Sequence, residues 1–331
     1  MGKPIRIGTR ESQLAVWQAT KVQQLLLENN FQSTLVYIKS EGDIDLKTPL
    51  YEMGVQGIFT KSLDIALLNN TIDIAVHSMK DVPTQMAKGI VQAAVLERAS
   101  YKDILVYKES SMVNGQGSTI NSQWSMINEN DDSEENPFIA QHSQFTFATS
   151  SIRRKAQWLN RYPHHAIENL RGNVNTRLQK VADNNWHGAI FAAAGIERIG
   201  LRPSNSIDLD WMLPAPAQGA IMVVGRENDH YFLDACAHFN HNHTAVCTKI
   251  ERDFLRILLG GCSTPISALA TVKDKNIIFK GNILSVDGKE KVTIEKEVAL
   301  ADSDGFGKIA AREILENGGQ KIVEGIRNAS H

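Results

Sequence analysis

The chain has 331 residues, of which 42% are hydrophobic and 22% charged, and its formal net charge is −2 at pH 7. This length is too great for one compact core and predicts two or three domains of ordinary globular composition. The lack of a basic excess argues against nucleic acid as the main partner, and no apolar run approaches the roughly 18 residues of a membrane span.

The N-terminal segment and the cysteines favour a cytoplasmic protein. The first residues, MGKPIRIGTRES, have neither the long apolar segment nor the cleavage site of a secretory signal. Three cysteines, Cys236, Cys247 and Cys262, are odd in number and lack CxxC spacing. A disulfide framework is therefore not expected, and a reducing compartment fits.

Short apolar segments alternate with helical patterns over the first hundred residues. Strands are expected at residues 5–8, 35–38 and 72–76, with one helix capped by Ser12 and another over residues 60–68. The third strand ends at the polar sequence His-Ser-Met-Lys-Asp, residues 77–81. This alternation predicts βαβ units and a mostly parallel sheet.

Residues from about 108 to 143 are rich in Ser, Asn, Gln, Asp and Glu. Such a composition cannot bury enough apolar surface to offset its ordering entropy, so it predicts a mobile insertion. A partner-binding loop anchored by Trp124, Met126 and Ile127 is the alternative.

The alternation resumes after the insertion and changes character near residue 242. Strands are expected at 145–149, 165–170 and 188–192, and helices at 151–161 and 173–183. A proline-containing connector, 213–219, leads to a strand at 220–225. A long helix over 244–259, several strands and a C-terminal helical stretch then predict a separate, smaller α+β domain.

Arginines occur at two successive junctions between a strand and a helix. Arg153 and Arg154 lie in the first turn of a helix, where the positive end of the helix dipole disfavours them unless an anion lies nearby. Arg171 stands at the next junction, with Arg177 further along. Open α/β sheets bind ligands at the carboxyl ends of their strands, so these residues predict an anion site. Solvated surface arginines are the alternative.

Further candidates follow other strands and one glycine pair. Arg10, Lys80 and Arg198 lie just after expected strands, and guanidinium groups suit carboxylates. Asp81 could stabilise a cation or move a proton, or could be a structural turn residue. Cys262 follows two glycines and is either a reactive loop thiol or incidental. Neither a metal-ligand set nor a nucleotide-binding motif is evident.

Segments along the whole chain together resemble the hydroxymethylbilane synthase family, also called porphobilinogen deaminase. His-Ser-Met-Lys-Asp-Val-Pro at residues 77–83 and Thr-Ser-Ser-Ile-Arg-Arg at 149–154 are the most specific matches. The others are Thr-Arg-Glu-Ser at 9–12, Leu-Arg-Gly-Asn-Val at 170–174, Ala-Gln-Gly-Ala at 217–220 and Gly-Gly-Cys at 260–262, followed by Pro265.

The resemblance implies an α/β fold with two periplasmic-binding-protein-like lobes that have mixed, mostly parallel sheets. The first lobe would comprise residues 1–98 and 217–240, and the second residues 99–216. A smaller α+β domain, 241–331, would carry the cofactor cysteine. The implied enzyme is a monomer that condenses four porphobilinogen molecules, with loss of ammonia, on a dipyrromethane bound covalently through Cys262. Water then releases the linear tetrapyrrole.

The resemblance also assigns residues to this chemistry. Asp81 would be catalytic and, with Cys262, would hold the dipyrromethane. The other implied cofactor-binding residues are Lys80, Thr149, Ser151, Arg153, Arg154, Arg171 and Gln218. The implied substrate-binding residues are Arg10, Ser12, Arg153, Arg154, Arg171, Arg177 and Arg198.

The chain departs from the family pattern at several positions. Gln56 stands in a loop where the family usually has lysine, and Ala148 and Ala217 replace usual glycines. These changes leave open an inactive paralogue. An anion- or solute-binding module of the two-lobed type is a further alternative, although it gives Asp81 and Cys262 no purpose.

Overall fold

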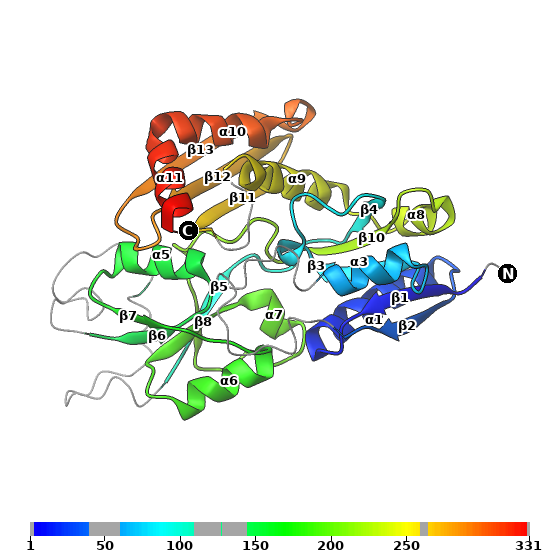
Figure 1. Cartoon of the computed structure of the whole chain (residues 1–331), viewed down its shortest axis with the longest axis horizontal. Helices are drawn as coiled ribbons and strands as arrows, with labels where there is room; N and C mark the ends of the chain where they lie inside the picture. The colour runs from blue at the N-terminus through cyan, green and yellow to red at the C-terminus, as the bar shows by residue number, and fades with distance from the viewer. Residues whose placement is uncertain (1–2, 40–59, 109–126, 128–143, 259–263, 330–331) are drawn as a thin grey trace.

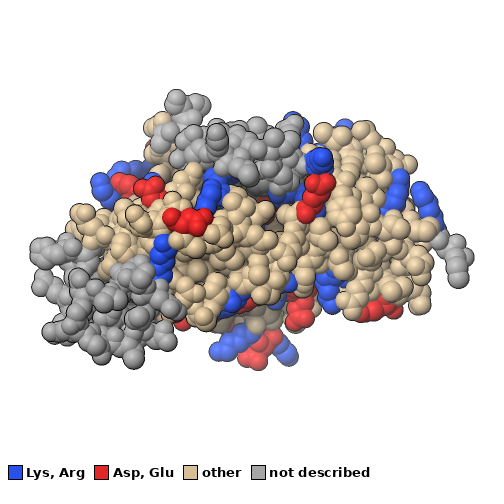
Figure 2. Space-filling view, turned by 90° about the horizontal axis from the view of Figure 1, so that it is seen from below, with Lys and Arg blue, Asp and Glu red and all other residues tan. Residues whose placement is uncertain are grey.

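The computed structural model describes residues 3–39, 60–108, 127, 144–258 and 264–329. These residues form two five-stranded sheets and one three-stranded sheet, each with its own helices (Figure 1). None of the described helices is long and apolar enough to cross a membrane. On the face in Figure 2, Lys and Arg side chains are dispersed among Asp and Glu side chains.

The first sheet has the strand order β2-β1-β3-β10-β4. Its strands are β1 (Ile5–Thr9), β2 (Ser33–Tyr37), β3 (Ile74–Ser78), β4 (Ile90–Val95) and β10 (Ile221–Arg226). β1 is parallel to β2 and β3, whereas β10 is antiparallel to β3 and β4, so only β10 is reversed. The helices of this lobe are α1 (Gln13–Glu28), α3 (Lys61–Leu68) and α8 (His230–Ala237).

The second sheet repeats this topology in the order β7-β6-β8-β5-β9. Its strands are β5 (Asp103–Tyr107), β6 (Thr146–Ala148), β7 (Ala166–Glu168), β8 (Gly188–Ala192) and β9 (Ser206–Asp208). β6 is parallel to β7 and β8, and β5 is antiparallel to β8 and β9. The helices are α5 (Ile152–Arg161), α6 (Val174–Asp183) and α7 (Ala193–Glu197). In each lobe the reversed strand is the one by which the chain arrives from the other lobe.

The two passages of the chain between the lobes touch each other. The Ala99 amide donates to the Gly219 carbonyl at 3.1 Å, and Arg98 Nε donates to the Gln218 carbonyl at 2.8 Å. Gly219 has a φ of +87°, and a Cβ there would lie 2.6 Å from the Ser100 carbonyl oxygen. The close approach therefore requires glycine.

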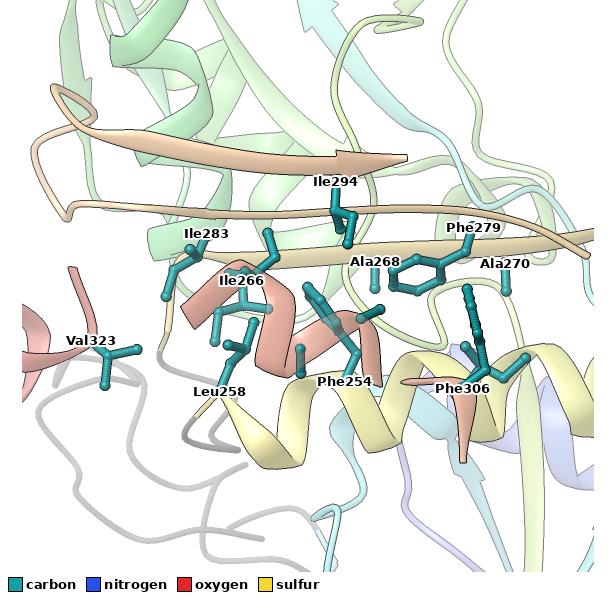
Figure 3. Close-up of a cluster of buried hydrophobic side chains, with 14 of the residues drawn as sticks. Phe254, Leu258, Ile266, Ala268, Ala270, Phe279, Ile283, Ile294, Phe306 and Val323 are labelled. Atoms are coloured by element: carbon teal, nitrogen blue, oxygen red, sulfur yellow. The ribbon is translucent and has the colours of Figure 1, made fainter. Parts of the chain in front are cut away.

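The third unit packs three helices against an antiparallel sheet. The sheet consists of β11 (Ile266–Lys273), β12 (Asn276–Leu284) and β13 (Lys291–Ala299), and the helices are α9 (Asn242–Ile257), α10 (Phe306–Ile314) and α11 (Gln320–Ala329). Phe254, Phe279 and Phe306 meet edge to face between sheet and helices (Figure 3), with ring centroids 5.1 and 5.9 Å apart along the series. Such contacts add to the burial of the rings themselves.

The predicted fold class, two mixed α/β lobes with a smaller α+β unit, is confirmed. The strand expected over 165–170 is shorter and covers Ala166–Glu168. Most of the insertion, including Trp124 and Met126, lies outside the described residues. Ile127 is described and fully buried, and its carbonyl accepts a hydrogen bond from the Tyr162 hydroxyl at 3.0 Å.

Candidate active site

Lys80 and Asp81 lie on a single turn of 3₁₀ helix, Met79–Asp81, directly after β3. β3 is a buried central strand, and Val82 beyond the turn is extended (φ −83°, ψ 128°) because Pro83 disfavours the helical region for it. Both side chains are half-buried. Within the described part of the chain, no hydrogen bond or ion pair engages the Asp81 carboxylate, so it is available to a ligand.

Arg153 and Arg154 lie in the first turn of α5, as predicted, and both are almost fully buried. The anion expected beside them is supplied by the chain itself. Asp103, which opens β5 and has no exposed surface, lies 2.7 Å from Arg153 Nη1 and 2.8 Å from Arg154 Nη2. Burial alone would raise the pKa of Asp103, but the two guanidinium charges hold it below its usual value.

Asp103 thus occupies part of each of the two guanidinium groups. Arg154 donates to Asp103 through Nε and Nη2 and to the Ile190 carbonyl through Nη1. Arg153 Nη1 also donates to the Leu213 carbonyl at 2.8 Å. Each guanidinium has five N–H donors, so some remain for a ligand in both side chains.

Gln218 connects Lys80 to this buried ion cluster. Its Oε1 accepts from Lys80 Nζ at 3.5 Å, and its Nε2 donates to Asp103 Oδ1 at 2.9 Å and to the Tyr101 carbonyl at 2.8 Å. Gln218 lies on the passage that returns to the first lobe, whereas Asp103 opens the first strand of the second. The amide therefore joins the two halves of the site.

The charges of Arg177 and Arg171 complete the cluster. The pKa of Arg177 falls to about 10 because of burial and of the like charge of Arg154, with Asp81 opposing and Arg171 adding to the shift. Burial likewise lowers the pKa of Lys80 to about 8. The structure therefore brings Asp81 and Lys80 of the first lobe close to the arginines of the second.

The predicted hydroxyl residues hold the local backbone. Ser12 caps α1 by accepting from the Ala15 amide at 3.4 Å, and Ser151 caps α5 by accepting from the Arg154 amide at 3.4 Å. Thr149 Oγ1 accepts from the Ser151 amide at 3.2 Å. Since these oxygens accept, their own protons can still be donated to a ligand.

Arg10 and Arg198 lie at the margin of the cluster. The Arg198 guanidinium donates to the Gly219 carbonyl at 2.6 Å and lies 5.7 Å from the ring centroid of Trp17. Arg10 is near His77: burial, and then the charge of Arg10, lower the pKa of His77 to about 4. Neither contact joins these two arginines directly to Asp103.

The residues present fit a ligand with several carboxylates. Among the described residues the cluster holds five cations, Lys80, Arg153, Arg154, Arg171 and Arg177, against the carboxylates Asp81 and Asp103. Arg177 Nε is buried and has no hydrogen-bond partner within the described ranges, a costly state that an anion would relieve. Cys262 and Gln56 lie outside the described residues.

Comparison with known proteins matches both parts of the chain to one family. Residues 5–234 match the family described as porphobilinogen deaminase, dipyromethane cofactor binding domain, and residues 245–316 match the porphobilinogen deaminase C-terminal domain. A porphobilinogen deaminase of Moorella thermoacetica is 37% identical over 330 residues, 98% of this chain and 97% of that protein. One from Pelobacter propionicus is 35% identical over 326 residues, 97% of each chain.

A more distant likeness exists among solved structures. A probable amino-acid ABC transporter extracellular-binding protein from Bacillus subtilis is 10% identical, with a TM-score of 0.39 over 72% of this chain and 90% of that one.

Proposed function

The chain belongs to the porphobilinogen deaminase family, and on that premise we propose how its residues divide the family's reaction among them. The enzyme is a hydroxymethylbilane synthase, a transferase of tetrapyrrole biosynthesis that joins four porphobilinogen molecules and releases ammonia at each addition. Its dipyrromethane cofactor supplies the pyrrole to which the first substrate is joined.

Asp81 is the group that stabilises positive charge in this reaction. Ammonia leaves the aminomethyl carbon of the substrate with the bonding electrons, so positive charge develops on the pyrrole that remains. The observation that carries the assignment is the Asp81 carboxylate, half-buried and unengaged within the described residues beside Lys80 and Arg177. A carboxylate fixed where cationic charge develops lowers the barrier without needing to reorganise.

The cationic residues bind the acetate and propionate groups of the pyrroles. Arg177 and Arg171 offer their guanidinium groups to these carboxylates, and the remaining N–H groups of Arg153 and Arg154 serve further ones. Bidentate pairing fixes both position and orientation of a carboxylate. Arg10 and Arg198 serve the substrate at the margin. Lys80, Thr149, Ser151 and Gln218 contact the cofactor, and Ser12 contacts the substrate.

Cys262 is the attachment point of the cofactor, and the other two cysteines support this assignment by exclusion. Cys236 and Cys247 are buried, in α8 and α9, and burial raises their thiol pKa values to about 12 and about 11. A thiol that resists ionisation is a poor nucleophile. α9 ends at Ile257, five residues before Cys262.

The domain boundaries, 1–98 with 217–240, 99–216, and 241–331, form part of this proposal. They are supported by the pairing of β10 with β3 and β4 of the first sheet. A monomer in the cytoplasm suffices for the reaction, because Asp81 and the arginine cluster come from one chain. The substrate is the small molecule porphobilinogen, and the reaction needs neither nucleic acid nor a membrane.

The experiment is an intact-mass and rate comparison of four proteins. Wild type made in a porphobilinogen-producing host should exceed its sequence mass by two porphobilinogen units less two ammonias. Cys262→Ala should lack that increment, whereas Cys247→Ala should keep it. Asp81→Asn should keep the increment but lose roughly 100-fold or more in kcat. A wild-type mass equal to the sequence mass would refute covalent attachment of the cofactor to Cys262. Near-normal turnover of Asp81→Asn would show that Asp81 does not act in the reaction.

A further inference from the structure

The turn that carries Lys80 and Asp81 is held by an arginine of the third unit. Arg252 of α9 donates through Nη1 to the Met79 carbonyl at 3.3 Å and the Val82 carbonyl at 2.8 Å. Its Nη2 donates to the Pro83 carbonyl at 2.6 Å. One guanidinium thus binds the backbone on both sides of Asp81. Figure 1 shows α9 passing above the end of β3 where this turn lies.

Besides this guanidinium, the turn is held by the Met79 amide, which donates to the Ala220 carbonyl at 3.0 Å, and by the buried side chains of Met79 and Val82. The turn is three residues long, and the hydrogen bond that closes it, from the Val82 amide to the Met79 carbonyl, measures 3.2 Å. Pro83 has no amide hydrogen with which to extend the pattern. Short 3₁₀ segments have poor hydrogen-bond geometry, so an external donor that satisfies three carbonyls strongly restricts their positions.

Glu251, which precedes Arg252 on α9, fixes this helix to the two passages of the chain between the lobes. Glu251 has no exposed surface. It accepts hydrogen bonds from Arg98 Nη1 and Nη2 at 2.6 and 3.0 Å and from the Ala217 amide at 2.6 Å. Arg252 therefore projects from an anchored part of α9, and its position is set independently of the turn it contacts. The next helical turns of α9 lead toward Cys262.

We propose that Arg252 is a positioning residue for the reaction, which fixes the Asp81 carboxylate relative to the arginine cluster and to the helix that precedes Cys262. The proposal rests on the assignment of Asp81 given above. Arg252 acts through the backbone of residues 79–83 and touches no reacting atom. A displacement of about 1 Å in a reacting group can cost up to 100-fold in rate.

The test compares Arg252→Gln and Arg252→Lys with a control on the same helix. Arg256 lies one turn further along α9, and its Nη2 pairs with Asp253 at 2.7 Å, a contact within the helix. We expect Arg252→Gln to keep the cofactor mass increment and to lose about 10- to 100-fold in kcat, with KM changed less than threefold. Arg252→Lys, which keeps a charged donor, should recover part of that loss. Arg256→Gln should match wild type within twofold.

Hydrogen exchange gives a readout that is independent of turnover. Amides of residues 78–84 should exchange faster in Arg252→Gln than in Arg256→Gln, because the turn opens more often without its external donor. Unchanged exchange together with unchanged kcat would overturn the proposal, and so would a lower thermal midpoint with kcat intact. Should Arg252→Gln not fold, the same criteria apply to Arg252→Lys.

A double variant separates this proposal from the role of Asp81. If Arg252 acts through Asp81, adding Arg252→Gln to Asp81→Asn should lower kcat by less than twofold more, because the group being positioned is already disabled. An equal loss in both backgrounds would refute positioning while leaving Asp81 in its role. Full activity of Asp81→Asn alone would instead overturn the proposed function.

Discussion

Lys80 lies among charges of both signs, and burial is the largest influence on the pKa of its ammonium group. Desolvation lowers its pKa to about 8; Asp81 and Asp103 oppose the shift, whereas Arg154 and Arg153 add to it. The ordinary lysine pKa is 10.5. Between these two pH values the unfolded chain binds more protons at Lys80 than the folded chain does. The free energy of unfolding therefore rises with pH in this range, because the buried side chain loses its charge.

We predict that Lys80 sets an alkaline limit on activity. If its ammonium binds a carboxylate of the ligand, kcat/KM should fall as the pH rises through about 8, because deprotonation removes that charge. Lys80→Arg should move the limb beyond pH 10, since a guanidinium stays charged there. Lys80→Gln should have a low kcat/KM at every pH, without the alkaline fall seen in the wild type. A pH profile of Lys80→Arg that overlays the wild-type profile would rule this role out.

Asp103 shows where reasoning from the sequence stops at the level of single residues. The arginine pair at a helix start predicts an anion, and an anion is present, but it is internal. Asp103 lies 51 residues from Arg154 and 115 from Gln218, and no local spacing connects them. The available signal is a carboxylate that opens a fully buried strand, because such a charge requires a partner.

At the level of elements, the third unit depends on a close contact between α9 and α10. Gly307, in the first turn of α10, lies so near α9 that an added Cβ would be 2.1 Å from the Ile250 carbonyl oxygen and 3.1 Å from Asp253 Cβ. The obstacle is backbone, so the helices would have to move apart. The same helix pair encloses the phenylalanine cluster of Figure 3.

We therefore predict that Gly307→Ala lowers the free energy of unfolding by about 2 kcal/mol, as overpacking does. Gly325→Ala is the matched control, because Gly325 is exposed on α11 and nothing lies within 4 Å of its added Cβ. That change should raise stability by roughly 0.5–1 kcal/mol, since alanine favours the helix. Urea unfolding measures both variants. Equal effects of the two substitutions on the free energy of unfolding would show that the close α9–α10 contact does not restrict the residue at position 307.

The elements themselves follow the sequence where their periodicity is strong. The helices expected over 151–161 and 173–183 occur as Ile152–Arg161 and Val174–Asp183, because capping residues and apolar spacing agree. The strand expected over 165–170 is only three residues long as β7, and β9, which the sequence did not predict, also has three residues. The reversed direction of β10 is set by the chain's return from the second lobe, which no local pattern encodes.

At the scale of the whole molecule, a buried ion pair joins the third unit to the first lobe at the two passages of the chain between the lobes. Arg98 precedes the passage into the second lobe, Ala217 lies on the returning passage, and Glu251 of α9 binds both. Glu251 also accepts the Ala270 amide of β11 at 2.8 Å. Arg98 and Glu251 are 153 residues apart, so the sequence indicates three domains but not this junction between them.

We predict that Glu251→Gln lowers the free energy of unfolding by about 3–5 kcal/mol, because it leaves the Arg98 charge, 11% exposed, without its counter-charge. In an Arg98→Met background the same change should cost far less, since no stranded cation remains. Glu290→Gln is the control: its pair with Lys321 is exposed at 47% and 79%, and its loss should cost under about 1 kcal/mol. Urea unfolding of the four variants measures the coupling, and additive losses for Arg98 and Glu251 would mean that the junction is held by packing rather than by charge.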